Sequence, residues 1–156
     1  MAVKTNVMRL LDKAKVEYKS HCYANTNAVS GLEVAKVLNQ NPKQVFKTLV
    51  TVSETNKYYV FLVPAADELD FKKAANSVSE KAVKMIKSKD LLEITGYIHG
   101  GCSPVGMKKS FVTTLDESAG NFETIIFSAG KIGYQVEVSL EELRKVITFS
   151  LSDLIQ

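Results

Sequence analysis

Eleven consecutive residues, His99 to Lys109, hold most of the side chain types found in nucleophilic active sites. They read HGGCSPVGMKK, with one histidine, one cysteine, one serine, three glycines and two lysines. A thiol or hydroxyl nucleophile needs a neighbouring base. His99 stands only three residues before Cys102, a spacing that does not position a base against a thiol. His21 stays open as the base, because catalytic partners are usually remote in sequence and adjacent in space.

The glycines of this stretch favour a different chemistry. Gly100, Gly101 and Gly106 permit positive φ angles and close approach of the backbone to a ligand. Backbone amides presented in this way can face an oxyanion or a phosphate. The stretch is not a P-loop, since the glycines lack the required spacing to a Lys-Ser/Thr pair. A structural turn around a small buried cysteine is the competing interpretation.

Lys47 is the most informative single residue. It lies in the β-rich segment VFKTLVTV at residues 45–52, where side chains alternate between the two faces of a strand. On its own face it stands between Val45 and Leu49. Burying an ammonium group without a partner is costly, so this lysine either serves an anion or reaches water from an edge strand. The pattern alone leaves both interpretations open.

Two further features bear on ligands. The sequence SAGKIG at 128–133 predicts a hairpin turn, and its GxxG pattern is also that of loops that let a nucleotide backbone approach. The lysines at 72–73, 81–89 and 108–109 predict solvated faces, with a tRNA-facing patch as the alternative. No group of histidine, cysteine and carboxylate residues has metal-ligand spacing, so we expect neither a metal nor a cofactor.

Length and composition place the chain among ordinary globular proteins. Its 156 residues suit one domain spanning 1–156, and its charge of +3 permits contact with nucleic acid without arguing for it. We expect no membrane contact, since the apolar runs are too short to cross a bilayer. We read no signal peptide at the N-terminus. Two cysteines fit a reducing cytoplasm better than a disulfide framework.

Several helices and strands must position these residues. Capping boxes at Ser30–Glu33 and Ser139–Glu142 open two helices, and Ser88 and Gly96 bound a third. Helices are predicted at 5–15, from Ser30 to the Asn41-Pro42 stop, and at 71–76, 88–95 and 140–146. Strands are predicted at 18–23, 45–52, 58–63, 83–86, 110–115, 123–128 and 134–138.

This order of elements predicts a mixed α/β fold. Consecutive strands alternate with scattered helices, which favours a partly antiparallel sheet flanked by helices over a doubly wound parallel sheet. The strands could close into a barrel, a point that the sequence leaves open.

Three segments together resemble the signatures of the YbaK/EbsC family. They are VFKTL at 45–49, GYIHGGCSPVG at 96–106 and SAGKIG at 128–133. In the family the signatures occur as FKTL, GYxxGGxSPxGxKK and SxGKxG, in the same order and at similar spacing. The resemblance extends over nearly the whole chain and includes His21 and Tyr23. It implies the fold of the editing domain of prolyl-tRNA synthetase, a barrel-like mixed sheet flanked by helices.

The resemblance also implies an activity. The chain is expected to be an aminoacyl-tRNA deacylase that removes cysteine from mischarged Cys-tRNA(Pro) in trans, with Cys-tRNA(Cys) as a further substrate. The substrate's own thiol would attack the ester, a lyase-like step if the thiol cyclises. The partners would be the CCA end of an aminoacyl-tRNA and prolyl-tRNA synthetase, in the cytoplasm. The alternatives are a sister deacylase for Ala-, Ser- or other aminoacyl-tRNA, and a non-catalytic tRNA-binding or regulatory module.

The resemblance assigns roles to ten positions. Lys47 would supply positive charge at the ester, and Gly100 and Gly101 would offer amides to the developing oxyanion. The residues expected to bind substrate are Tyr23, Ser30, Thr48, Ser103, Pro104, Ser128 and Gly130. Ser30 stands where the family often has an aromatic residue. Cys102 falls at a position that the family pattern leaves free, which disfavours it as a nucleophile.

Overall fold

The computed structural model describes residues 3–156, whose strands form two sheets. The three-stranded sheet has the order β1-β7-β6 and is antiparallel. The five-stranded sheet has the order β4-β2-β3-β5-β8. In it β2 pairs antiparallel with β3 and β4, while β3–β5 and β5–β8 are parallel. The strands are β1 (Lys19–Cys22), β2 (Phe46–Ser53), β3 (Tyr58–Pro64), β4 (Val83–Met85), β5 (Val112–Asp116), β6 (Ile125–Ser128), β7 (Tyr134–Val138) and β8 (Ser150–Ser152).

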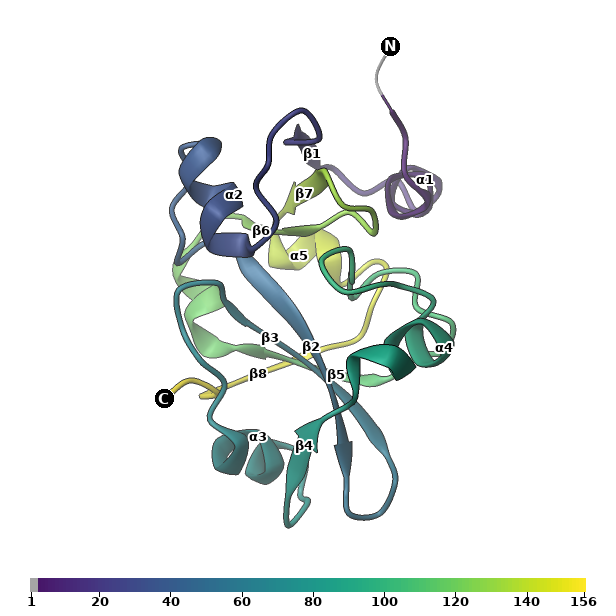
Figure 1. The fold of residues 1–156 in the computed structure, drawn as a ribbon, viewed down its shortest axis with the longest axis vertical. Helices are drawn as coiled ribbons and strands as arrows, with labels where there is room; N and C mark the ends of the chain where they lie inside the picture. The colour runs from purple at the N-terminus through teal and green to yellow at the C-terminus, as the bar shows by residue number, and fades with distance from the viewer. Residues whose placement is uncertain (1–2) are drawn as a thin grey trace.

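The mixed, partly antiparallel α/β fold is thus confirmed, but the sheets do not close into a barrel. They meet at one parallel bridge, between Val45 and Ile126, where the Ile126 amide also donates to the carbonyl of Gln44. One bridge brings the start of β2 beside β6 without making a continuous ladder. Figure 1 shows the smaller sheet above the larger one, with β2 running down from their junction.

Three of the helices begin at a hydroxyl cap, and two of these caps, Ser30 and Ser139, were predicted from the sequence. Thr5, Ser30 and Ser139 each accept a hydrogen bond from a first-turn amide, and Glu33 completes a reciprocal capping box with Ser30. The helices are α1 (Asn6–Lys13), α2 (Gly31–Val37), α3 (Phe71–Ser77), α4 (Leu91–Thr95) and α5 (Leu140–Leu143). Two 3₁₀ turns, η1 (Ser88–Asp90) and η2 (Glu117–Asn121), complete the list. None of the helices in this part of the chain is long and apolar enough to cross a membrane.

Three local expectations need correction. The predicted helix at 88–95 begins as η1, and Ser88 makes no capping bond. The second capping box is only half formed, because the Glu142 carboxylate accepts from the Glu17 amide instead of the Ser139 amide. Strand β8, which extends the larger sheet beside β5, has no counterpart in the sequence prediction.

The larger sheet has apolar clusters on both faces, which sets the direction of the β2 side chains. Val60 and Leu62 of β3 join the main core, whereas Phe61 and Val63 join a second cluster with α3. On β2, Phe46 and Val50 pack in the main core and Leu49 packs against the second cluster. Because side chains alternate along a strand, Thr48 faces the main core and Lys47 faces the α3 side.

Candidate active site

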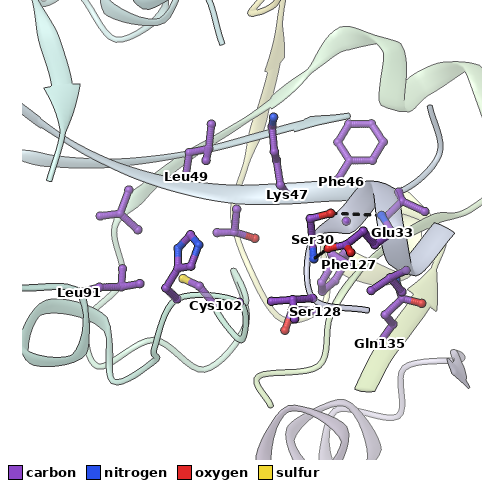
Figure 2. Close-up of a pocket in the computed structure, with 18 of the residues that line it drawn as sticks. Ser30, Glu33, Phe46, Lys47, Leu49, Leu91, Cys102, Phe127, Ser128 and Gln135 are labelled. Carbon is purple, nitrogen blue, oxygen red and sulfur yellow. Dashed lines mark hydrogen bonds between the residues drawn. The ribbon is translucent and has the colours of Figure 1, made fainter. Parts of the chain in front are cut away.

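A pocket of about 550 Å³ opens where the two sheets meet. Its walls come from β2, the start of α2, the turn before α4, the loop after Ile98, and the ends of β6 and β7. Figure 2 shows the labelled lining residues gathered around β2. Six of the ten predicted site residues line it: Tyr23, Ser30, Lys47, Thr48, Gly100 and Ser128. The structure therefore brings residues from all three signature segments to one cavity.

The Lys47 side chain lies at the edge of this pocket and is directed away from its interior. In Figure 2 it extends from β2 on the side opposite to Cys102 and Ser128. Its Nζ lies 3.8 Å from Oε1 of Glu68, and its side chain is 31% exposed. The lysine thus reaches solvent, although β2 is not an edge strand of its sheet, and its partner is a carboxylate of the chain itself.

The ion pair with Glu68 is weak and does not fix Lys47 in place. The Glu68 side chain is 79% exposed, so water screens the attraction. Exposed pairs of this kind contribute less than about 1 kcal/mol. A change of side-chain rotamer that turns the Lys47 ammonium group from Glu68 toward a ligand at the pocket edge therefore costs little free energy.

The glycine loop supplies fewer free amides than its sequence implied. The amide of Gly101 donates to the carbonyl of Ile98 at 3.0 Å, which closes a turn. Gly100 adopts φ +88° and lines the pocket. A Cβ on Gly101 would lie 3.3 Å from the backbone nitrogen of Ile132. Gly101 thus lets the two glycine-containing loops pack together, and Gly100 is the glycine of this loop that lines the cavity.

Four predicted site residues, Gly101, Ser103, Pro104 and Gly130, do not line the pocket. Ser103 is fully buried, and its Oγ accepts a bond from the Val105 amide. Pro104 lines a separate cavity of about 330 Å³. The amide of Gly130 donates to Oγ of Ser128. These residues shape the loops around the site.

The position of Tyr97 explains why glycine is needed at residues 106 and 130. A Cβ on Gly106 would lie 2.7 Å from the Tyr97 hydroxyl oxygen, and one on Gly130 would lie 2.9 Å from the Tyr97 ring. Both glycines have positive φ, +80° and +86°. The Tyr97 hydroxyl donates to the carbonyl of Val105, and burial raises the pKa of Tyr97 to about 12. Tyr97 therefore links the two loops.

Cys102 lines the pocket as a protonated thiol. Burial raises its pKa to about 12, an effect that a hydrogen bond with Thr95 opposes only in part. A thiol in this state is a poor nucleophile at neutral pH, since the thiolate is the reactive form. Neither Cys102 nor Cys22 forms a disulfide.

The start of α2 forms a polar wall of the pocket. Oγ of Ser30 accepts from the Glu33 amide at 3.2 Å, and the Glu33 carboxylate accepts from the Ser30 amide at 3.1 Å, as Figure 2 shows. These bonds hold the pKa of Glu33 below its usual value, with the Ser30 amide as the largest cause. The hydroxyl of Ser30 is therefore occupied as a helix cap.

Gln135 on β7 is a site residue that sequence reasoning missed. It is 4% exposed and lines the pocket. Its Oε1 accepts from Nε2 of Gln40 at 2.9 Å, so its amide nitrogen is the group left for a ligand. A glutamine in a strand carries no pattern that marks it as functional. Only the pairing of β7 with β1 and β6 reveals where it lies.

Apolar residues form most of the remaining wall, and none of them was predicted from the sequence as a site residue. They are Val29, Val34, Val45, Phe46, Leu49, Val50, Met85, Ile86, Leu91 and Phe127. Among residues 3–156 no three histidine, cysteine or acidic side chains gather as a metal-binding group. The cavity can hold a small organic group of mainly apolar character, with polar contacts from β2, Gly100, Ser128 and Gln135.

Residues 26–146 match the model of the aminoacyl-tRNA editing domain family. A relative from Enterococcus faecalis, named "Putative Cys-tRNA(Pro)/Cys-tRNA(Cys) deacylase EbsC", is 45% identical over 141 residues, which cover 90% of this chain and 86% of the relative. A proline–tRNA ligase from Lactobacillus helveticus is 27% identical over 105 residues, 67% of this chain and 18% of that enzyme.

The fold also matches solved structures along its whole length. One, described as "a putative trans-editing enzyme for prolyl tRNA synthetase", superposes with a TM-score of 0.81 over 99% of both chains. Sequence identity to it is 23%, so this match supports the fold alone.

Proposed function

Because the chain belongs to the aminoacyl-tRNA editing domain family, we propose that it is a deacylase that hydrolyses mischarged Cys-tRNA(Pro) in trans. Cys-tRNA(Cys) is proposed as a further substrate, in line with the name of the Enterococcus faecalis relative. The need for such an enzyme is physical. A difference of about one methylene in a binding pocket is worth only about 1–3 kcal/mol, so a synthetase needs a second site to remove a similar amino acid.

The observation that carries this proposal is the convergence of three distant segments on one pocket. Thr48, Gly100 and Ser128 come from the three signature segments, and all of them line the same cavity. The volume of about 550 Å³ has room for an aminoacyl group and part of a terminal nucleoside.

The proposed reaction uses the thiol of the substrate. The thiol loses its proton, sulfur bonds to the ester carbon, and the bond from that carbon to the tRNA oxygen breaks. The departing oxygen of the tRNA takes up a proton, and water then opens the cyclic thioester to give free cysteine. The protonated state of Cys102 supports this route, because the pocket offers no activated thiol of its own.

Two groups of the chain are proposed to stabilise the negative charge that develops on the ester carbonyl oxygen. Lys47 turns from Glu68 toward the substrate and supplies positive charge as the oxyanion develops. Gly100 lines the same pocket, and its amide is assigned to the developing oxyanion. Backbone donors at an oxyanion are worth about 3–4 kcal/mol each where they have been dissected. The Gly101 amide, which is bonded to Ile98, is assigned to the loop structure instead.

The proposed partners are the CCA end of aminoacyl-tRNA and prolyl-tRNA synthetase. The match to a segment of a proline–tRNA ligase supports the second partner. We assign the activity to the cytoplasm, where two free cysteines persist in reduced form.

A panel of mischarged tRNAs tests the proposal. The purified chain is incubated with Cys-tRNA(Pro), Cys-tRNA(Cys), Ala-tRNA(Pro) and a Ser-tRNA, and the acylated fraction is followed against a buffer control. We expect rapid loss of the cysteinyl ester and slower loss of the esters that lack a thiol. Comparable rates on Ala- or Ser-tRNA would assign the chain to a sister deacylase. Salt-dependent tRNA binding without turnover would assign it to a binding module.

A further inference from the structure

Strand β2 has an open backbone edge beside the pocket. On one side it pairs with β3 from Phe46 to Val52. On the other side β4 covers only Thr51 to Ser53. Val45 makes a single bridge to β6. Between these two contacts the edge borders the pocket, whose lining includes every β2 residue from 46 to 50.

The alternation of backbone hydrogen bonds along β2 shows which N–H and C=O groups point to this edge. Val45 accepts from the Ala65 amide, and the Ser53 amide donates to Lys57, so the odd-numbered residues of β2 direct their backbone groups toward β3. In an antiparallel pair the intervening residues direct theirs to the opposite edge. The hydrogen bond from the Ile86 amide to the carbonyl of Val50 confirms that the even-numbered residues direct their backbone groups to the β4 side. The N–H and C=O of Thr48 therefore both point to the pocket side.

The segment that follows β4 would pair with Thr48 if it continued as a strand, but it leaves the sheet. The β4 register places Ile86 opposite Val50, so a continued strand would place residue 88 opposite Thr48. At that residue the backbone instead enters the 3₁₀ turn Ser88–Asp90. Thr48, Ser88 and Leu91 all line the cavity, which occupies the position where a further strand residue would lie.

We propose that the aminoacyl group of the substrate occupies this position as a single added β-residue opposite Thr48. Its α-ammonium donates to the carbonyl of Thr48, and its ester carbonyl accepts from the Thr48 amide. The inference rests on the proposed deacylase function and adds the element that recognises the part shared by aminoacyl esters. The Thr48 amide then takes the oxyanion-donor role that Gly101, bonded to Ile98, does not fill.

An independent observation at the same residue supports this placement. Oγ1 of Thr48 is enclosed and has no hydrogen-bond partner among the described residues. A buried hydroxyl without a partner is unfavourable. A polar ligand group beside Thr48 would supply one.

The first test removes the α-ammonium from the substrate. Cys-tRNA(Pro) is compared with 3-mercaptopropionyl-tRNA(Pro), which keeps the thiol and the ester but lacks the amine. Each rate is divided by the uncatalysed hydrolysis rate of the same ester. For the wild-type chain we expect this rate enhancement to fall at least about tenfold, the value of one charge-assisted hydrogen bond.

The second test addresses the Thr48 amide. Thr48→Pro removes the N–H on an open edge, where proline is tolerated, whereas Thr48→Val keeps it. We expect Thr48→Pro to be at least about tenfold slower than Thr48→Val on Cys-tRNA(Pro). As a measurement that needs no variant, ¹⁵N-labelled wild-type chain is titrated with 3′-cysteinylamino-3′-deoxyadenosine. We expect the NMR resonance of the Thr48 amide to shift and its proton to exchange more slowly with solvent.

The results of these tests distinguish a failure of the edge pairing from a failure of the proposed deacylase function. If no aminoacyl-tRNA is deacylated, the proposed function is wrong. If Cys-tRNA(Pro) is deacylated but the deaminated ester shows an equal rate enhancement, the edge pairing is wrong. It is also wrong if Glu33→Gln abolishes the preference for the amine, since Glu33 would then be the ammonium partner. The edge pairing would also be rejected if the NMR resonance of the Thr48 amide stays unchanged while the resonances of other pocket residues shift.

Discussion

At the scale of single residues, Lys47 and Glu68 form an ion pair, which the proposed mechanism replaces with a contact between Lys47 and the substrate. The pair is long, at 3.8 Å, and its carboxylate is exposed, so little free energy opposes the replacement. We expect Lys47→Ala to lower single-turnover deacylation of Cys-tRNA(Pro) by at least about 100-fold, as for loss of an oxyanion-stabilising group. Glu68→Gln is the matched control and should keep wild-type rates. A Lys47→Ala variant with half the normal rate would remove this lysine from the mechanism.

Cys102 offers a second prediction at this scale. Because burial keeps its thiol protonated, with a pKa of about 12, it is not expected to attack the ester. Cys102→Ala and Cys22→Ala should each stay within about threefold of wild type in the same assay, a change below 1 kcal/mol in barrier. Complete loss of turnover on removal of Cys102 would mean that the enzyme, and not the substrate, supplies the nucleophile.

At the scale of elements, β4 and η1 connect the pocket to a lysine-rich surface. Met85 and Ser88 line the cavity, and Lys84, Lys87 and Lys89 alternate with them as exposed residues. We propose that these lysines form the tRNA-facing patch that the sequence analysis named as the alternative to a solvated face. The phosphates next to the CCA end would then lie along this edge.

Charge reversal tests that patch. Lys87→Glu should weaken tRNA binding and lower the slope of log affinity against log salt by about one per lost phosphate contact. Lys13→Glu at the end of α1, which lies at the far end of the molecule from β4 in Figure 1, changes the net charge equally and serves as the control. Binding is measured by filter retention over a salt series. Equal losses in the two variants would indicate a non-specific effect of net charge.

The elements were largely predictable because their signals are local. Caps such as Ser30 and the polar turn before Tyr58 act within a few residues, and they mark where helices and strands begin. Strand β8 escaped prediction because its three residues, Ser150–Ser152, are too few to show an alternating pattern and include two serines. Gln135 and the direction of Lys47 were hidden from the sequence for a different reason. Both depend on which strands lie side by side, and the motif positions alone carry no such information.

At the scale of the whole molecule, two glutamates connect its distant parts. The Glu142 carboxylate of α5 accepts from the Glu17 amide before β1 at 2.7 Å. The Glu80 carboxylate, after α3, accepts from the Tyr59 hydroxyl on β3 at 2.6 Å. These hydrogen bonds hold the pKa of each glutamate below its ordinary value, with the Glu17 amide and the Tyr59 hydroxyl as the largest causes.

Acid should therefore loosen the fold through these two carboxylates. A group with a lowered folded pKa stabilises the protein above its unfolded pKa, and this contribution is lost as pH falls through the folded value. We expect the urea midpoint to be flat from about pH 8 to 6 and to fall below about pH 4.5, the region where unfolded glutamates titrate. The double variant Glu80→Gln, Glu142→Gln should start lower at neutral pH and decline less steeply. A decline as steep as that of wild type would show that other carboxylates govern acid unfolding.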